Sequence, residues 1–238
     1  MVKLGVNIDH IATLRQQRKV GYPSVIEAAK IIQECGAHQI TVHLREDRRH
    51  IQDEDVVELK KILQIPLNLE MSTNEEIVEF ALKVVPDEVC IVPERRQELT
   101  TEGGLDLKNN FKKIKSVVER LKEKCIKVSL FVEPEKESIL LAKKLGADVV
   151  ELHTGRYSLC KVGSKKFFYE LKRIERAAEV VLKEGLILNA GHGLDYNNVR
   201  YIAKIKGMNT LNIGFSIVSK AVFVGLRQAV KEMLDLIS

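Results

Sequence analysis

The sequence has 238 residues, of which 45% are hydrophobic and 30% are charged, and its formal net charge is +5. This length is close to the ~250 residues of one (β/α)8 barrel, and the composition is ordinary for a globular protein. The positive charge suits small anionic ligands, but the basic residues are spread over predicted helices among acidic neighbours, which disfavours a nucleic-acid surface.

Short apolar runs that end in a polar or charged side chain recur eight times, and a helical pattern follows each run. The predicted strands cover residues 4–9, 40–45, 66–71, 89–94, 128–133, 149–154, 187–192 and 210–214. Their nearly continuous apolar character is typical of parallel strands that are covered by helices.

The predicted helices alternate with these strands and have a helical spacing of apolar residues. They cover residues 24–36, 53–63, 75–85, 111–125, 136–147, 165–185, 195–205 and 216–237, and a short helical or loop segment lies at 11–18. Ser24 is the expected N-cap of the first helix, and three acids open the second, where the helix dipole favours them.

Eight strand–helix units without a linker predict one α/β domain over residues 1–238, a (β/α)8 TIM barrel with a few extra short helices. A doubly wound open sheet is the alternative, and it is disfavoured because no Gly-x-Gly-x-x-Gly follows the first strand. The active site of a barrel lies at the C-terminal ends of its strands. The longest irregular segment, residues 94–109, is predicted to be a lid.

The four cysteines show no Cys-x-x-Cys pair and no zinc-ligand spacing, so we expect them to be reduced. No apolar run approaches the ~20 residues that span a bilayer. The first predicted strand begins at residue 4, which leaves no room for a signal peptide. These features predict a cytoplasmic protein without a membrane segment.

Two glutamates, Glu70 and Glu151, lie inside apolar strands near their C-terminal ends. A buried carboxylate is costly unless it is paired or functional, and burial raises its pKa toward the range of a general base. The structural alternative is an ion pair inside the barrel, with Arg45 or Arg15 as the partner. The position at the strand ends favours a catalytic role.

Four of the six histidines lie at strand ends and can converge on one rim of the barrel; they are His10, His43, His153 and His192. His43 and His192 are the strongest candidates for proton transfer, because imidazole titrates near neutral pH. His153 shares a strand face with Glu151, and both a catalytic and a packing role are open for it. His38 lies at the other end of the barrel and is predicted to be structural.

A cluster of cationic side chains just beyond the second predicted strand contains Arg45, Arg48, Arg49 and His50. Guanidinium groups bind phosphate in a bidentate manner. Acidic residues lie between these cations, so a solvated charged loop is the alternative. Arg15 and Arg18, after the first strand, are equally ambiguous.

Glycines follow the last two strands, in AGHG at 190–193 and in NIGFS at 212–216. Such glycines let backbone N–H groups approach an anion at a helix N-terminus, and barrels often bind phosphate at this position. Ordinary turn chemistry is the alternative. Two separated anion sites would suit two phosphorylated substrates.

A metal site is a second reading of the same residues, because histidines and glutamates can ligate zinc or iron. The chain has no His-x-His after its first strand and no His-Glu-x-x-His motif. We therefore assign no metal ligand among the site residues.

Seven segments of the chain resemble the pyridoxine 5'-phosphate synthase family, whose members close the ring of vitamin B6. They are NIDHIATLRQQR, TVHLREDRRHI, LNLEM, VPERRQELTTEGGLD, ELHTG, NAGHGL and LNIG. The resemblance extends from the first strand to the last helix. It implies an enzyme that joins 3-amino-2-oxopropyl phosphate with 1-deoxy-D-xylulose 5-phosphate. The products would be pyridoxine 5'-phosphate, phosphate and water, formed without a metal or an organic cofactor.

The resemblance also implies roles for individual residues. His43 and Glu70 would be proton acceptors. His192 would be the proton donor, and Glu151 would stabilise the transition state. The residues that would hold the amino-ketone phosphate are Asn7, Arg18, Gly193, Gly214 and Phe215. The residues that would hold the deoxyxylulose phosphate are Asp9, His10, Arg45, His50 and Thr100, the last of them in the predicted lid.

The family is similar in forming an octamer built from four dimers, so the resemblance implies a homo-oligomer in which Arg18 reaches a neighbouring subunit's site. One position departs from the family, because Phe215 stands where many relatives have histidine. A backbone N–H contact there would tolerate phenylalanine, whereas a contact made by the imidazole would be lost. The resemblance implies no role for Glu133.

The residue types suit the chemistry that the resemblance implies. Imine formation needs an acid for the departing water, ring closure needs a base that removes a C–H proton, and loss of phosphate needs stabilisation of the dianion. Two other classes remain open, namely a metal-dependent barrel hydrolase or aldolase and a phosphosugar-binding barrel without catalysis. Chelator-sensitive activity would favour the first, and ligand binding without turnover would favour the second.

Overall fold

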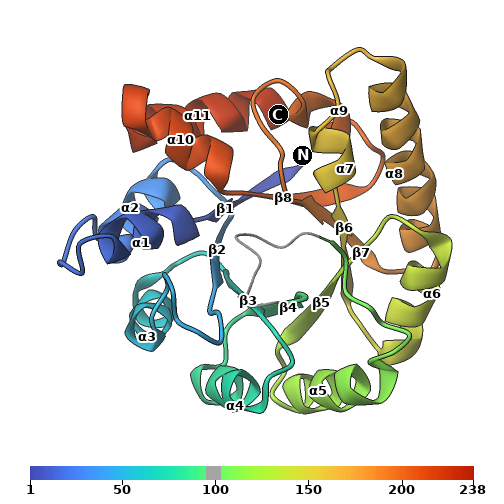
Figure 1. Ribbon diagram of the computed structural model, residues 1–238, viewed down its shortest axis with the longest axis horizontal. Helices are drawn as coiled ribbons and strands as arrows, with labels where there is room; N and C mark the ends of the chain where they lie inside the picture. The colour runs from blue at the N-terminus through green and yellow to red at the C-terminus, as the bar shows by residue number, and fades with distance from the viewer. Residues whose placement is uncertain (95–102) are drawn as a thin grey trace.

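The computed structural model describes residues 1–94 and 103–238. Eight parallel strands form a closed barrel in chain order, and helices surround the ring (Figure 1). The strands are β1 (Lys3–Asn7), β2 (Gln39–His43), β3 (Leu67–Met71), β4 (Glu88–Ile91), β5 (Lys127–Val132), β6 (Val149–His153), β7 (Ile187–Gly191) and β8 (Met208–Ile213). The predicted α/β class and (β/α)8 TIM-barrel architecture are confirmed.

Each strand is followed by one or more helices on the outside of the ring (Figure 1). In the described part of the chain they are α1 (Asp9–Gln16), α2 (Val25–Glu34), α3 (Asp53–Ile62), α4 (Glu75–Val84), α5 (Phe111–Glu123), α6 (Lys136–Leu145), α7 (Gly155–Ser158), α8 (Lys165–Lys183), α9 (Val199–Ala203), α10 (Phe215–Val224) and α11 (Leu226–Ile237). The expected extra short helices are present as α1 and α7.

Local side-chain chemistry explains where several helices begin. The Ser24 hydroxyl accepts a hydrogen bond from the Glu27 N–H at 3.1 Å and caps α2, as predicted. The Asn74 side chain accepts from the Glu76 N–H at 2.9 Å and caps α4 in the same way. At the other end of the barrel, His38 precedes β2 and its Nδ1 accepts from the Leu4 N–H at 3.2 Å, which is the predicted structural role.

The apolar core lies mainly between the strands and the surrounding helices, whereas the interior of the barrel is partly polar. Thr41 of β2 donates to the Asn212 side chain of β8 at 3.1 Å, and Asn68 of β3 donates to Thr41 at 3.4 Å. Because β1 separates β2 from β8 in the ring, the Thr41–Asn212 bond runs through the interior. Polar side chains inside the barrel are therefore fixed by a network of hydrogen bonds.

Two predicted helices were wrong in extent. The segment 216–237 is divided into α10 and α11 at Gly225, whose φ of 80° and ψ of 153° cannot continue a helix. The helix predicted at 195–205 is reduced to α9, because the Asp195 carboxylate accepts hydrogen bonds from the N–H groups of Asn197 and Asn198. These bonds form a turn where helical bonds were expected.

The four cysteines are free, as predicted. In the part of the chain that the structure describes, no helix is both long and apolar enough to cross a membrane.

Candidate active site

The strand register brings the predicted proton-transfer residues to neighbouring positions at one rim of the barrel. His43 of β2 is paired with Glu70 of β3, and Glu151 of β6 is paired with Asn189 of β7. His192 directly follows β7. These side chains come from strands that are far apart in the sequence, and the closed ring makes them face a common centre.

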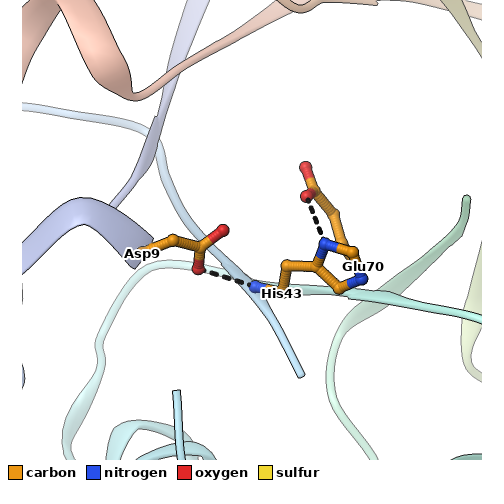
Figure 2. A group of neighbouring side chains, drawn as sticks. All are labelled: Asp9, His43 and Glu70. Atoms are coloured by element: carbon orange, nitrogen blue, oxygen red, sulfur yellow. Dashed lines mark hydrogen bonds and ion pairs between the residues drawn. The ribbon is translucent and has the colours of Figure 1, made fainter. Parts of the chain in front are cut away.

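Asp9, His43 and Glu70 form a compact cluster at this rim (Figure 2). The backbone N–H of His43 donates to Oδ1 of Asp9 at 2.8 Å, and Nδ1 of His43 lies 3.9 Å from Oε2 of Glu70. Asn7 holds Asp9 in place, because its side-chain N–H donates to Oδ2 of Asp9 at 2.8 Å. Asn7, Asp9, His43 and Glu70, all predicted site residues, are therefore brought together.

The carboxyl group of Glu70 is poised to hold or release a proton. Its side chain is only 16% exposed, and burial, with the negative charges of Asp9 and Glu151, raises its pKa well above the usual value. The structural alternative, an ion pair with Arg15 or Arg45, was wrong. Arg15 instead binds Asp55 through two hydrogen bonds of 2.7 Å, and Arg45 lies beside Glu94.

A second carboxylate lies on the other side of the His43 ring. Oε2 of Glu94 is 3.5 Å from Nε2 of His43, and Oε1 accepts from the Glu46 N–H at 2.9 Å. Burial opposes ionisation of Glu94, but the contacts with His43, the Glu46 N–H and Arg45 outweigh it and lower the pKa of Glu94. The charged form of Glu94 is therefore favoured beside the His43 ring, a contact that was missed because the sequence shows only a strand-end acid.

Glu151 lies deeper in the barrel and is 2% exposed. Its Oε2 accepts a hydrogen bond from the Asn212 side chain at 2.6 Å, and burial raises its pKa to about 7. A Cβ at position 191 would lie 2.1 Å from Oε1 of Glu151, so only Gly191 leaves room for this carboxyl group. A carboxyl group with a pKa near neutral can interact with developing charge in either protonation state.

His192 is connected to two residues outside the predicted catalytic set. Its Nδ1 lies 3.0 Å from Nε2 of His153, and Nδ1 of His153 lies 2.7 Å from Oε1 of Glu133. Burial lowers the pKa of His192 to about 4. Both Glu133 and His153 stand at strand ends in the sequence, but their link depends on the β5–β6 register, which the sequence does not show.

The two glycine-containing turns lie beside each other, as a phosphate site requires. The Ser216 hydroxyl donates to the Leu194 carbonyl at 2.8 Å and ties the turn after β8 to the turn after β7. Gly214 is the N-cap of α10, and the Cβ that it lacks would lie 2.9 Å from Cβ of Asn7. The first N–H groups of α10 and Asn7 thus share one corner of the rim.

Phe215 is the first residue of α10, and its side chain is 68% exposed. Its ring packs edge-on against His10, with ring centroids 5.2 Å apart. The backbone N–H of Phe215 belongs to the open first turn of the helix, whose N–H groups have no intrahelical partner. A backbone contact at this position therefore needs no imidazole side chain.

The cationic cluster after β2 is divided between the site and the surface. Arg48 pairs with Asp53 and Glu76, and Arg49 pairs with Asp47, so these two match the alternative of a charged loop. Arg45 is 2% exposed and lies next to Glu94.

The ring of His50 lies 6.2 Å from that of His43, between centroids, which brings this predicted residue to the site. Two other predicted residues are not brought there. Arg18 is exposed beyond the end of α1, and no contact within the described residues joins it to the site. Thr100 and the rest of residues 95–102, half of the predicted lid, lie outside the described residues.

Residues 4–238 match the protein family described as Pyridoxal phosphate biosynthesis protein PdxJ. A protein of Coxiella burnetii named Pyridoxine 5'-phosphate synthase is 54% identical over 238 residues, covering 100% of this chain and 99% of the relative. A protein of the same name from Prochlorococcus marinus is 51% identical over 238 residues, with the same coverage of both chains.

Solved structures with low sequence identity share the fold alone. Orotidine 5'-monophosphate decarboxylase from Methanocaldococcus jannaschii superposes with a TM-score of 0.68 at 16% identity, covering 100% of this chain and 99% of that one. Thiamine phosphate pyrophosphorylase from Pyrococcus furiosus gives a TM-score of 0.62 at 18% identity, covering 99% and 95%. The full-length match at more than half identity is decisive, and the chain belongs to the PdxJ family of pyridoxal phosphate biosynthesis proteins.

Proposed function

We propose that the chain is a pyridoxine 5'-phosphate synthase of vitamin B6 biosynthesis. It joins 3-amino-2-oxopropyl phosphate with 1-deoxy-D-xylulose 5-phosphate and releases pyridoxine 5'-phosphate, phosphate and water. The observation that carries this proposal is the convergence of His43, Glu70, Glu151 and His192 at one rim, in a chain that is 54% identical to a protein of that name.

Proton removal in this reaction is assigned to Glu70 and His43. The raised pKa of Glu70 suits a group that takes a proton from carbon at neutral pH, because base strength rises with pKa. His43 lies 3.9 Å away and has Glu94 on its other side, so the two bases can act on neighbouring atoms of a bound substrate.

Proton donation is assigned to His192 and charge stabilisation to Glu151. His192 and His43 enter the site from different parts of the strand ring, because β8 and β1 separate β7 from β2. An acid and a base that approach from different sides suit a condensation in which a hydroxyl group departs while a C–H proton is removed.

The two phosphate groups are assigned to separate corners of the rim. Asn7, Gly193, Gly214 and the N–H of Phe215 form the corner for the amino-ketone phosphate, supported by the open first turn of α10. Asp9, His10, Arg45 and His50 are assigned to the deoxyxylulose phosphate, together with Thr100, which lies outside the described residues. Arg18 is assigned to the amino-ketone phosphate of a neighbouring subunit, which fits its exposed position.

The enzyme is proposed to act in the cytoplasm as an octamer of four dimers. A large apolar face on α10 supports association, because Val222 and Phe223 are 75% and 88% exposed. Such a face is rarely left open to water in a monomer.

The proposal is tested by incubating the purified protein with both phosphorylated substrates. Pyridoxine 5'-phosphate and inorganic phosphate should appear in equal amounts. A folded protein that binds either substrate and forms no product would contradict the proposal and support the non-catalytic binding barrel.

The arrangement of Asp9, His43 and Glu70 also favours a second candidate, a metal-dependent barrel enzyme. One ligand atom from each residue lies within 4.8 Å of the others, a spacing that a divalent cation can bridge. Metal analysis of the purified protein and assays with and without a chelator distinguish the two. Product formation that is unaffected by chelation supports the metal-independent synthase.

A further inference from the structure

Three side chains on neighbouring strands, Glu133, His153 and His192, form a line of hydrogen-bond contacts at the rim. Glu133 follows β5, His153 ends β6, and His192 follows β7. The hydrogen-bond distances along this line are 2.7 Å and 3.0 Å. The two imidazole rings are inclined by only 18°, and their centroids are 5.2 Å apart with 3.0 Å between the facing nitrogens, so both nitrogens lie close to the line between the centroids. This arrangement suits proton transfer between them.

The line is fixed at both ends. Oε2 of Glu133 accepts from Arg173 at 3.2 Å, and Oε1 also accepts from the Gly104 N–H at 3.2 Å. The Thr154 hydroxyl, at 2.7 and 2.6 Å from the carbonyl oxygens of Gly191 and His192, holds the turn in which His192 has a φ of 79°. A non-glycine residue in this left-handed conformation is costly and persists where surrounding contacts impose it.

The His153 ring is shielded from water, since its side chain is 4% exposed. A Cβ at position 155 would lie 2.4 Å from its Nε2, so Gly155 leaves the space that the ring occupies. In contrast, Nε2 of His192 has no hydrogen-bond partner among the described residues. At one end of the line Glu133 is held by hydrogen bonds, and at the other end Nε2 of His192 is available to a substrate.

The carboxylate of Glu133 determines how protons are distributed along this line. Its Oε1 is an acceptor 2.7 Å from Nδ1 of His153, so this nitrogen carries a proton, and in the state from which the relay starts Nε2 of His153 donates a second N–H to Nδ1 of His192. His192 must then accept at Nδ1, which places its own proton on the open Nε2. A neutral His192 can donate from this position, which matters because burial lowers the pKa of His192 to about 4 and makes its cationic form scarce at neutral pH.

We propose that Glu133 and His153 are positioning residues that form a proton relay behind His192. This inference rests on the proposed function, in which His192 is the proton donor. The proton on Nε2 of His192 passes to the departing hydroxyl of the carbinolamine. Its C–O bond breaks and the oxygen leaves as water with the bonding electrons, while the lone pair of the neighbouring nitrogen forms the C=N bond of the protonated imine. At the same time the N–H bond at Nε2 of His153 breaks, and that proton binds Nδ1 of His192.

After this step His153 is neutral and keeps its N–H toward Glu133, while Nε2 of His192 carries a lone pair. That lone pair can accept a proton from a later intermediate. Nδ1 of His192 then returns its proton to Nε2 of His153. The relay therefore lets one histidine act first as an acid and then as a base without a free imidazolium in the site.

The charged groups around His153 determine in which direction a change at Glu133 shifts the pH dependence of kcat. Glu133 is the nearest charge to His153, and Arg173 and Arg156 approach its other oxygen at 3.2 and 3.9 Å. Glu151 lies on the same strand face as His153, two residues earlier. The change Glu133→Gln would remove the nearest counter-charge of a protonated His153 and leave the two guanidinium groups in place.

The kinetic test compares Glu133→Gln with Glu135→Gln, a control that removes an exposed carboxylate beside Arg173 without contact to His153. In Glu133→Gln the alkaline limb of kcat should move about one pH unit or more toward lower pH. At pH 8 kcat should fall by about 10- to 100-fold while KM changes by less than about threefold. The control should keep the wild-type limb. An unshifted limb in Glu133→Gln, or a loss confined to KM, would overturn the relay.

A second measurement uses the wild-type protein without substrate and thus separates the relay from the proposed reaction. Imidazole ¹⁵N spectra at pH 7 should show protons on both nitrogens of His153 and a His192 ring protonated on one nitrogen. A His153 ring that lacks the proton on Nε2 would overturn the relay. A missing product in the assay with both substrates would instead overturn the proposed function and leave this spectrum interpretable.

Discussion

At the scale of single residues, His43 lies between two carboxyl groups that the protein keeps in different states. Glu70 has few compensating contacts and its pKa is raised, whereas Glu94 is bound by His43 and a backbone N–H and its pKa is lowered. The protein therefore favours the protonated form of Glu70 and the charged form of Glu94. Such a separation of pKa values marks an acid–base site.

The change Glu70→Gln should abolish proton removal without disturbing the fold. Glutamine has nearly the same shape but cannot accept a proton, so kcat should fall by about 10² to 10⁴. Glu58→Gln, at an exposed position on α3, serves as the control and should retain wild-type kcat. Thermal unfolding and kcat are measured for both variants. Near-wild-type turnover of Glu70→Gln would show that Glu70 is not the base.

Glu151 makes a prediction about stability and pH. Its pKa is raised from 4.5 in its ordinary state to about 7 in the folded protein, so the folded protein binds the proton more tightly than the unfolded chain does. Stability is therefore lost as pH rises from about 4.5 to about 7, and the loss is constant above that range.

Glu151→Gln lacks this penalty and should be more stable than the wild type by up to about 3 kcal/mol at pH 8, with little difference below pH 4.5. Urea unfolding of both proteins at several pH values measures the difference directly. Two curves that run parallel from pH 4.5 to pH 8 would show that Glu151 does not carry the raised pKa.

At the scale of elements, the strands and most helices could be predicted because their signals are local. Strands buried on both faces read as continuous apolar runs, and Ser24 supplies a cap that the structure uses. The division between α10 and α11 was missed, although Gly225 was present as a signal within an otherwise helical pattern. A glycine is often tolerated inside a helix. Whether a helix continues through a glycine depends on the backbone conformation of that residue, which cannot be read from the sequence.

The sequence was sufficient to predict which strand ends carry reactive groups. It was not sufficient to predict which side chains contact those groups. His43 and Glu70 meet because consecutive strands of a barrel are neighbours. The links from Glu94 to His43 and from Glu133 to His153 depend on side-chain reach and register. Those properties arise only when the ring closes with a particular stagger.

The break at Gly225 gives a prediction for the last two helices. Its φ of 80° and ψ of 153° lie in a region that only glycine adopts readily, and no atom lies within 4 Å of the missing Cβ. Gly225→Ala should therefore lower the free energy of unfolding by about 1–3 kcal/mol through backbone strain alone.

Gly21→Ala is the matched control, because the space around Gly21 is equally open and its φ is not in the left-handed region. Its free energy of unfolding should change by less than about 0.5 kcal/mol. Equal unfolding midpoints in urea for the two variants would show that the α10–α11 junction bears no such strain.

At the scale of the whole molecule, the surface of α10 is unusual for an outer helix. Ile217 is its only buried hydrophobic residue, while Phe215, Val222 and Phe223 are exposed, and Leu14 on the neighbouring α1 is 59% exposed. Helices elsewhere on the ring carry charged outer faces, such as that of α5. An apolar face of this kind fits a second copy of the chain better than it fits water.

Placing a charge on this face should separate the proposed oligomer. Phe223→Glu buries a carboxylate against an apolar partner, so light scattering after size-exclusion chromatography should give a lower mass than for the wild type. Tyr169→Glu, 69% exposed in the wild type and on α8 at the opposite side of the ring, is the control (Figure 1). Because Arg18 is assigned to a neighbouring subunit's site, dissociation should also raise KM for the amino-ketone phosphate. A wild-type protein that is monomeric at assay concentrations would contradict both the octamer and this role of Arg18.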